Sequence, residues 1–475
     1  MKTLTQVFSY SFGNVVIILA GLVSFPVFTR MLSPSDYGVM SLVNLTVTIM
    51  VIFGKCGLQQ SLVRYWYSDK YENSTVLSTA LFGSSGIAVL LTGSLMIAAF
   101  VVSRAENDSR YFILAAIVSA LVLMETVKSI LFNKMRILQQ VARYNIAGIA
   151  TKYLQIIFAV IVLSYINRTV YGLFAGFVVA SLFVLVCIFL KEEKGQASLK
   201  HFRKVSFREM LSFGFPLAFY ELTNQALMFL DRYLIGYYMG SNSVGTYSAA
   251  YNLTYYIQSI MVASVTLVIY PMVVEISSRQ GEKAGKEFIR DTTIWFCLFG
   301  SAVTFGFMSV GKEIFILMAS KAYAEAAVII SPVMLGGFLY GIFTVAAGEL
   351  FVAKKTRTMA LLMGIVAIVN ISLNLWLIPS KGILGAAIAT LVAEALLCII
   401  GLYTIRALGR IDTIGKIAYY MIPSFLMFVG LRFIPVQISW TSIAVRTVAG
   451  FLLWFACSFA MIGRFRAEIT SRFAK

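Results

Sequence analysis

Residues 211–256 have the sequence LSFGFPLAFYELTNQALMFLDRYLIGYYMGSNSVGTYSAAYNLTYY, which places charged residues within an apolar stretch. Most of it is apolar and long enough to enter a bilayer, because a helix needs about 20 apolar residues to cross the hydrocarbon core. It nevertheless holds Glu221, Asp231 and Arg232, and each charge costs about 2.5–3.5 kcal/mol at mid-membrane on insertion scales. A membrane segment keeps such residues where they pair with one another or face a cavity.

The same stretch resembles the start of the chain. Residues 31–42 read MLSPSDYGVMSL and residues 239–252 read MGSNSVGTYSAAYN, with a shared glycine that recurs 207 positions later. A second match pairs Gly172 with Gly382, 210 positions apart. The two matches have nearly the same offset, which predicts that the chain contains an internal repeat.

Composition predicts the broad class. Hydrophobic residues make up 59% of the 475, charged residues 13%, and the mean hydropathy is +0.85, whereas soluble domains carry about 25% charged residues. We therefore expect an all-α polytopic membrane protein with about fourteen transmembrane helices. The second span is predicted at residues 37–59 and the ninth at 290–310, and the amphipathic segment 311–327 is expected to lie in the membrane interface.

The loop charges predict the orientation of the chain. The net charge is +18, and most of the basic residues fall in alternate loops, as cytoplasmic loops require. Both termini are therefore expected in the cytoplasm. Nucleic acid is excluded as a partner, because the basic residues are spread over many loops instead of forming one face.

The longest of these loops suggests a domain division. We predict an N-terminal six-helix lobe over residues 1–190, a basic cytoplasmic linker over 191–208, a second six-helix lobe over 209–405, and two additional helices with a basic tail over 406–475. Because six is an even number, both lobes enter the membrane in the same direction and form parallel repeats. In such folds the substrate site lies between the two halves.

The sequence carries no signal of an enzyme. It has one histidine, His201, and five cysteines without metal or redox spacing. It also lacks a phosphate-binding glycine loop with its lysine. We expect no catalytic activity, no cofactor and no metal, so that ion gradients, the membrane potential or the substrate gradient would drive any transport.

Four stretches carry a resemblance to a known family. They are RMLSPSDYGVMSL (30–42), DRYLIGYYMGSNSVGTYSAAYN (231–252), LMASKAYAEAA (317–327) and NLWLIPSKGILGAAIATL (374–391). With them the whole chain resembles the O-antigen-type, Wzx-like flippases of the multidrug/oligosaccharidyl-lipid/polysaccharide (MOP) exporter superfamily. Ser320 stands where the family usually has glycine. The resemblance identifies the superfamily more sharply than the substrate.

The resemblance implies a function. Two six-helix lobes would surround a central cavity and alternate in access, and a cationic lumen would receive the pyrophosphate of an undecaprenyl-pyrophosphate-linked oligosaccharide. The lipid would be flipped from the cytoplasmic to the outer leaflet of a bacterial inner membrane. The expected partners are this lipid and membrane lipids, with the polysaccharide polymerase machinery as a further candidate.

An anionic pyrophosphate needs cations in a cavity of low dielectric constant, where arginine offers a planar fork and lysine a point charge. Structural pairing or snorkelling toward the interface remains the alternative for each basic residue. Lys128 lies one turn after Glu125, which predicts a pair on a helix surface. The candidate pyrophosphate-binding residues are Arg30, Lys55, Lys152 and Arg232.

An ion-driven transporter also needs a carboxylate that can change protonation or bind sodium. Glu221 and Asp231 are the candidates for ion coupling, with cross-helix pairing as the alternative for both. Two other function classes stay open. An ion-coupled multidrug exporter of the same superfamily would favour twelve spans and an acidic cavity, and a membrane polymerase or glycosyltransferase would favour a large aqueous loop.

Overall fold

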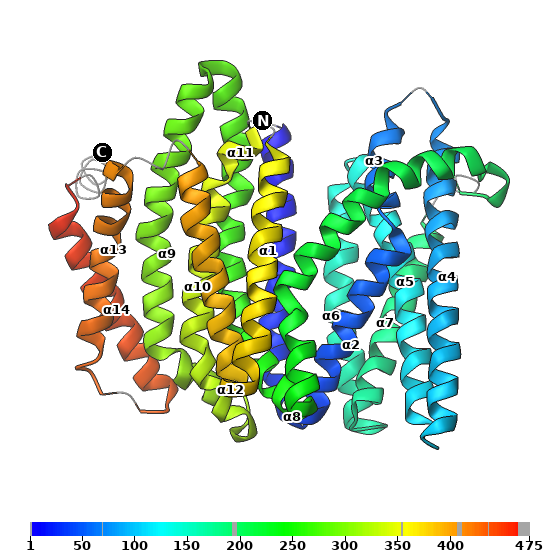
Figure 1. Ribbon diagram of the computed structural model, residues 1–475, viewed down its shortest axis with the longest axis horizontal. Coiled ribbons are helices and arrows are strands. Elements are labelled where there is room, and N and C mark those ends of the chain that lie inside the picture. The colour runs from blue at the N-terminus through cyan, green and yellow to red at the C-terminus, as the bar shows by residue number, and fades with distance from the viewer. Residues whose placement is uncertain are drawn as a thin grey trace. The chain divides into compact units, whose positions relative to one another are not determined.

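The computed structural model describes residues 2–68, 70–191, 197–352, 355–405, 411–435 and 437–463. Within these ranges the regular structure is entirely helical and no strand occurs. The chain divides into two compact units, residues 1–233 and 234–475 (Figure 1). The long helix α8 passes from the first unit into the second. An all-α polytopic architecture is confirmed.

The first unit packs its helices as sequential neighbours, with α4 along α5 and α6 along α7. Its elements are α1 (Lys2–Met31), α2 (Pro34–Lys55), α3 (Leu58–Trp66), α4 (Asn73–Ala105), α5 (Arg110–Ile137), α6 (Val141–Tyr165), α7 (Val170–Leu190), the short 3₁₀ helix η1 (Leu199–His201) and the first part of α8 (Lys204–Gln280).

In the second unit α10 packs on α12, and α9 packs on both α10 and α13. Its elements after α8 are α9 (Glu282–Met318), the 3₁₀ helix η2 (Lys321–Ile329), α10 (Ile330–Ala346), α11 (Gly348–Val352), α12 (Thr356–Thr404), α13 (Ile411–Leu431) and α14 (Trp440–Met461).

These helices supply about fourteen membrane crossings. Eleven described stretches are long and apolar enough to span a bilayer. One of them, Leu361–Thr404, turns back at Gly382 and so crosses twice. The two arms of α8, on either side of Gly240, are each longer than the roughly 20 residues that a crossing needs. The predicted span count is therefore confirmed.

Both turns depend on glycine. Gly240 has φ 79° and Gly382 has φ 61°, a region in which a side chain is strained. The glycine lets the chain reverse within one residue between two long helices. The two turns are neighbours in the second unit, since a Cβ on Gly382 would approach the Met239 side chain to 3.1 Å.

The second predicted span ends earlier than expected. Residues Cys56 and Gly57 both adopt left-handed conformations, with φ 44° and 74°, and they separate α2 from α3. Leu58 and Leu62 of α3 are fully buried against Val76 and Leu77 of α4. Burial of such side chains contributes about 1.5–3 kcal/mol each. This packing holds α3 against α4 and α5, so that the chain does not continue along the axis of α2.

The ninth span is longer than predicted. Helix α9 continues to Met318, so residues 311–318 extend the helix of the ninth span instead of forming a separate segment. Phe315 is fully buried in this extension, which explains why an amphipathic stretch with Lys312 and Glu313 stays helical. Residues 321–329 form the 3₁₀ helix η2 that leads into α10.

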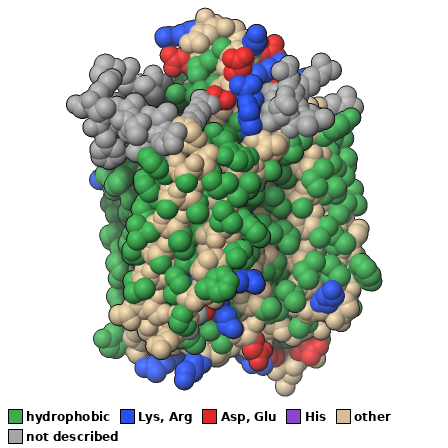
Figure 2. All heavy atoms as spheres, turned by 90° about the vertical axis from the view of Figure 1, so that its left-hand side faces the viewer, with side chains coloured by type: hydrophobic (Ala, Val, Ile, Leu, Met, Phe, Trp, Pro, Cys, Tyr) green, Lys and Arg blue, Asp and Glu red, His purple; other side chains and the backbone are tan. Residues whose placement is uncertain are grey.

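The outer surface has the character of a membrane belt. On the face that carries α13 and α14, hydrophobic side chains fill the middle and charged side chains lie toward both ends (Figure 2). Val445, Val448, Phe451 and Leu452 of α14 are all exposed. Apolar surface of this extent is stable against lipid, whereas it would be a liability in water. The protein is therefore a multi-pass membrane protein.

Candidate functional site

The site begins where α3 meets the first arm of α8. Gly57 and Gly214 touch through their backbones, and a Cβ on either would collide with the other residue. Beside them the Ser61 hydroxyl donates to the Met210 carbonyl at 2.5 Å. The Arg64 guanidinium lies 4.1 Å from the centre of the Phe213 ring. This close seam fixes the position of α8 in the first unit and brings Glu221 to the end of α2.

Lys55 and Glu221 form the first buried charge pair. The Lys55 Nζ lies 3.1 Å from Glu221 Oε1, and the lysine side chain is 8% exposed against 29% for the glutamate. Gln59 Nε2 donates to Glu221 Oε2 at 3.1 Å, and Gln60 Nε2 donates to the same oxygen at 3.4 Å. The carboxylate thus accepts hydrogen bonds from three side chains. A buried lysine stays charged only with such a partner.

Lys128 and Glu125 form the second pair. The Lys128 Nζ lies 2.6 Å from Glu125 Oε1, with 3% of the lysine side chain exposed. Ser181 of α7 donates to the same carboxylate oxygen at 3.2 Å and accepts from Lys128 at 3.3 Å. Gln155 of α6 also donates to Ser181. The predicted pairing of Lys128 with Glu125 is confirmed, but the pair lies inside the unit and not on a lipid-facing helix surface.

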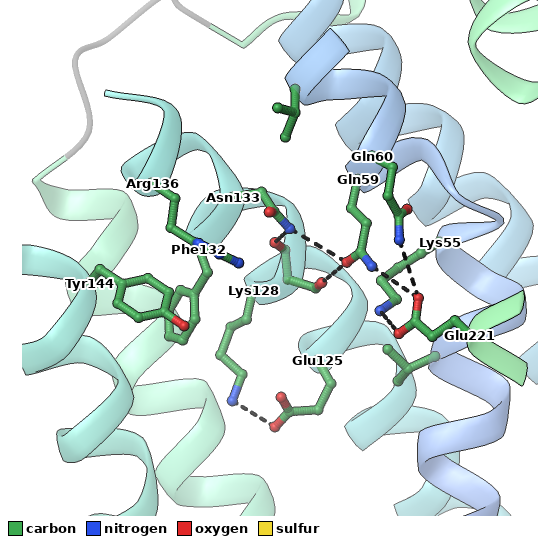
Figure 3. A pocket seen from close by; sticks show the side chains of 13 residues that line it. Lys55, Gln59, Gln60, Glu125, Lys128, Phe132, Asn133, Arg136, Tyr144 and Glu221 are labelled. Carbon is green, nitrogen blue, oxygen red and sulfur yellow. Dashed lines mark hydrogen bonds and ion pairs between the residues drawn. The ribbon is translucent and has the colours of Figure 1, made fainter. Parts of the chain in front are cut away.

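Both pairs line one cavity of about 490 Å³ within the first unit (Figure 3). The cavity is open, because Glu125 and Glu221 keep 32% and 29% of their side chains exposed. Three cationic side chains and two carboxylates face it. The lining residues are Val51, Lys55, Gln59, Gln60, Val63, Glu125, Lys128, Ser129, Phe132, Asn133, Arg136, Tyr144 and Glu221.

The cavity lining also includes neutral polar and aromatic side chains. Gln59 Oε1 accepts from the Ser129 hydroxyl at 2.7 Å and from Asn133 Nδ2 at 3.4 Å, so its amide bridges α5 and Glu221. The rings of Phe132 and Tyr144 meet edge to face, with centroids 5.6 Å apart. The site therefore combines ionic groups with amides, a hydroxyl and aromatic rings.

The candidate residues predicted from the sequence lie in different parts of the structure. Lys55 and Glu221 meet in the cavity. Lys152 of α6 is exposed and interacts electrostatically with Glu125 and Lys128. Arg30 is exposed in the last turn of α1.

Asp231 and Arg232 lie in a second buried cluster. Arg232 Nη1 donates to the Ser41 hydroxyl at 3.1 Å, and its guanidinium lies 4.7 Å from the Phe229 ring centre. Asp231 accepts a hydrogen bond from the Arg232 backbone at 2.8 Å. Ser41 and Lys55 are about 21 Å apart along α2, at 1.5 Å per residue. One diphosphate group cannot contact Arg232 and Lys55 together in this arrangement.

From the sequence, Glu125 and Lys128 were expected only as a pair, and Ser129, Asn133 and Arg136 were not singled out. All five follow the spacing i, i+3, i+4, i+8 and i+11, which places them on one face of α5. A polar stripe along a transmembrane helix is the signal that would have found them, because such a face must meet protein or water.

Comparison with known proteins identifies the family. Residues 3–277, more than half of the chain, match the family described as "Polysaccharide biosynthesis protein". The chain belongs to this polysaccharide biosynthesis family. A family relative is the "Putative O-antigen transporter" of Shigella flexneri, which is 22% identical over 400 residues, covering 80% of this chain and 91% of the relative.

Solved structures share the fold of this polysaccharide biosynthesis family member. The lipid II flippase MurJ in an inward closed conformation matches with a TM-score of 0.81 and 17% identity, covering 97% of this chain and 99% of that chain. An inward-facing multidrug resistance MATE transporter of the MOP superfamily matches with a TM-score of 0.62 and 12% identity, over 85% and 95%. The predicted resemblance to polysaccharide-biosynthesis proteins is confirmed by the family match, and these solved structures show that the chain shares their fold.

Proposed function

We propose that this protein moves a diphosphate-linked oligosaccharide lipid from the cytoplasmic to the outer leaflet of a bacterial inner membrane. The observation that carries the proposal is the pair of buried lysines, Lys55 and Lys128, at one cavity inside a transmembrane unit. Family membership and the name of the Shigella flexneri relative support the substrate class.

The lysines suit a diphosphate because their present partners are carboxylates. An anionic headgroup replaces Glu221 at Lys55, or Glu125 at Lys128, without leaving a buried cation unpaired. Both carboxylates are about one-third exposed, so they can turn toward water when they are displaced. Binding is then an exchange of anions around fixed cations, which costs less than burying a new charge.

The transport cycle follows from this exchange. The headgroup enters the cavity of the first unit from the cytoplasm while the prenyl tail stays in lipid, and alternating access then releases the headgroup outside. Both termini stay in the cytoplasm. Lys152 lies close enough to Glu125 and Lys128 to add a further positive charge to the bound state. Arg30 and Arg232 contact the headgroup at a different stage from Lys55.

Ion coupling is proposed at Glu221. Displacement by the headgroup deprives this carboxylate of its lysine, and a proton or a sodium ion compensates the charge. Asp231 is the second coupling residue, beside Arg232 in the separate cluster. No enzymatic step and no cofactor enters the cycle.

Transport in reconstituted vesicles tests the proposal. Wild type is compared with Lys55→Ala and Arg232→Ala, using a fluorescently labelled undecaprenyl-diphosphate oligosaccharide and an impermeant quencher. Lys312→Ala, at the predicted outer end of α9 and away from the cavity lining, is the matched control. We expect wild type and the control to flip the lipid and Lys55→Ala to lose at least tenfold in rate.

Two results would overturn the proposal. Unchanged flipping rates in Lys55→Ala and Arg232→Ala would show that both basic residues serve the structure and not substrate binding. Export of an organic cation by wild type, with no lipid flipping, would instead support the ion-coupled multidrug exporter, which shares the fold.

A further inference from the structure

A cluster of cations outside the cavity lies where the chain enters α8. Residues 199–208, which comprise η1 and the start of α8, form a basic segment with four exposed cationic side chains, Lys200, Arg203, Lys204 and Arg208. We propose that this basic segment binds the anionic headgroups of phospholipids at this end of the membrane, which is the cytoplasmic leaflet in the proposed orientation. The inference concerns bulk membrane lipid and not the transported substrate.

The start of α8 has two different faces. Ser206, Met210 and Gly214 recur every four residues and are all buried. Lys204 and Arg208 recur at the same spacing and are exposed, and two residues of offset turn them to the opposite side of the helix. A helix with a basic exposed face is suited to lie along a membrane surface.

The buried face is fixed to the first unit. The Phe207 ring occupies the space beside Gly83 of α4, where a Cβ would come within 2.6 Å of the ring. The Met210 carbonyl accepts a hydrogen bond from Ser61 of α3. Figure 1 shows the result, in which the first turns of α8 run across the end of the first unit while α4 and α5 run along it. The exposed face is therefore turned to the surroundings.

Contacts with α4 set the depth of the basic segment in the membrane. The Ser198 backbone donates to the Ser78 hydroxyl at 3.1 Å, and the Arg203 backbone donates to the Thr79 hydroxyl at 3.5 Å. Thr79 is about 15 Å along the helix from Val89, the midpoint of α4. Because the hydrocarbon core is roughly 30 Å thick, half of its thickness separates the two residues. The basic segment therefore lies at the level of the headgroups.

Apolar side chains of the basic segment suit the same position. Leu199 and Val205 are 70% and 68% exposed, between the cations. The neighbouring helix α4 also exposes Leu90 and Ile97, as a helix face in contact with acyl chains does. At the edge of the headgroup region the cations reach phosphate groups, while Leu199 and Val205 reach the acyl chains.

The charge of the basic segment selects anionic lipids. None of its four cations forms an ion pair with a described residue, and the adjacent Glu209 is paired with Lys70 at 2.7 Å. Clusters of four or more lysines and arginines beside a transmembrane helix attract anionic lipids, with about fivefold in affinity from each cation. A soluble acidic protein would need the basic segment to stand clear of the membrane, whereas the contact with Thr79 holds it at the headgroups.

Lipid binding to the purified full-length protein tests the inference. Native mass spectrometry in detergent compares its affinities for anionic dioleoyl phosphatidylglycerol and zwitterionic dioleoyl phosphatidylcholine. Two variants remove two cations each, and a third keeps the charge. They are Lys200→Gln/Arg203→Gln, Lys204→Gln/Arg208→Gln and Lys204→Arg/Arg208→Lys. The matched control is Arg279→Gln/Lys283→Gln, which removes two exposed cations at the turn between α8 and α9.

We expect wild type and the control to bind phosphatidylglycerol at least tenfold more tightly than phosphatidylcholine. Each variant that removes two cations should bind phosphatidylglycerol at least tenfold more weakly than wild type, because each lost cation contributes about fivefold. Its affinity for phosphatidylcholine should stay unchanged. The charge-preserving variant should bind both lipids like wild type. Because the two neutralised pairs lie in different turns of the chain, a folding failure of one leaves the other as the test.

Four results would overturn the inference. They are equal affinities of wild type for the two lipids, unchanged phosphatidylglycerol affinity in both neutralised variants, an equal loss in the control, and full displacement of the lipid by glycerophosphoglycerol. The last compound is the same headgroup without acyl chains, so its binding would indicate a site for a soluble anion. The flipping assay is a separate measurement, and a wild type that flips no lipid would overturn the proposed function alone.

Discussion

The two units differ in how much charge they bury. Among the described residues the first unit buries five charged side chains, Lys55, Lys128, Lys134, Asp231 and Arg232, and the second unit buries two, Glu349 and Arg446. Several buried hydrogen bonds of the second unit join neutral groups. Ser301 donates to Ser424 at 2.8 Å, Asn374 donates to Asn370 at 2.9 Å, and Gln258 donates to the Val333 carbonyl at 2.6 Å.

The ion pairs described in the second unit involve mostly exposed side chains, although Lys286 also lies 3.8 Å from the buried Glu349. Lys286 pairs with Glu282 at 2.7 Å, and both side chains are well exposed. A repeated helical architecture therefore does not determine the chemistry of the interior. In the first unit the buried lysines Lys55 and Lys128 line a cavity, whereas several buried hydrogen bonds of the second unit join neutral groups on different helices and serve packing. This contrast is the reason for proposing the anion site in the first unit.

The largest expected effect comes from the seam that brings Glu221 to Lys55. Gly57→Ala places a Cβ against the Gly214 backbone and strains a residue with φ 74°. We expect a loss of about 3 kcal/mol or more in the free energy of unfolding, because overpacking and left-handed strain each cost roughly 1–3 kcal/mol. The melting temperature in detergent measures this loss of stability.

Gly86→Ala is the matched control for this substitution, since a Cβ on Gly86 meets nothing within 4 Å. Equal melting temperatures for the two variants would show that the seam between α3 and α8 is looser than described.

Removal of one carboxylate gives the next largest effect. Glu221→Ala leaves Lys55 buried without its partner, and about 1–3 kcal/mol of stability should be lost. Glu282→Ala in the second unit should leave the melting temperature unchanged, since that pair is exposed. Thermal melting of each variant compares the two units directly. Similar losses of melting temperature in Glu221→Ala and Glu282→Ala would contradict the proposed difference between the units.

Loss of a neutral hydrogen bond in the second unit should cost less. Ser424→Ala removes the partner of Ser301, which also donates to the Leu298 carbonyl and so stays satisfied. We expect a loss of about 1 kcal/mol or less, with flipping of the lipid unchanged. A flipping rate that falls as far as in Lys55→Ala would place transport chemistry in the second unit too.

The smallest effect concerns a surface pair at the edge of the seam. The side-chain hydrogen bond with Glu209 raises the pKa of Lys70 above its ordinary value. A raised folded pKa stabilises the fold below the ordinary lysine pKa of about 10.4, and the contribution disappears as the pH rises through the folded pKa.

Glu209→Gln should therefore lower the melting temperature slightly at neutral pH and not at all above the folded pKa of Lys70. Melting curves of wild type and variant across this pH range make the comparison. A difference that grew with rising pH would contradict the assigned direction.

The sequence predicted the architecture because apolar length and loop charge are local signals. Membrane spans, the basic loops and the single buried charges Lys55 and Glu221 could all be recognised. Their pairing could not, because the two residues are 166 positions apart and meet only through the contact of α3 with α8. The break at Cys56 and Gly57 was also hidden, since left-handed conformations at two successive residues leave little trace in hydropathy.

The predicted internal repeat shows how much structural detail a sequence match can predict. Gly172 and Gly382 match in sequence, yet their structural roles differ. Gly172 approaches the Asn167 carbonyl from a regular helix, as Gly385 approaches the Leu377 carbonyl, while Gly382 forms the turn itself. By its close approach to a backbone carbonyl, Gly172 resembles Gly385, which lies three residues after Gly382.

The central claim is that Lys55 is kept for the substrate and not for stability. The double variant Lys55→Met/Glu221→Leu tests it, since replacing both members of a buried pair with apolar residues is often neutral for folding. In reconstituted vesicles we predict that this variant inserts and melts like wild type but flips the diphosphate-linked oligosaccharide at least tenfold more slowly. Flipping at the wild-type rate by the folded double variant would contradict the account.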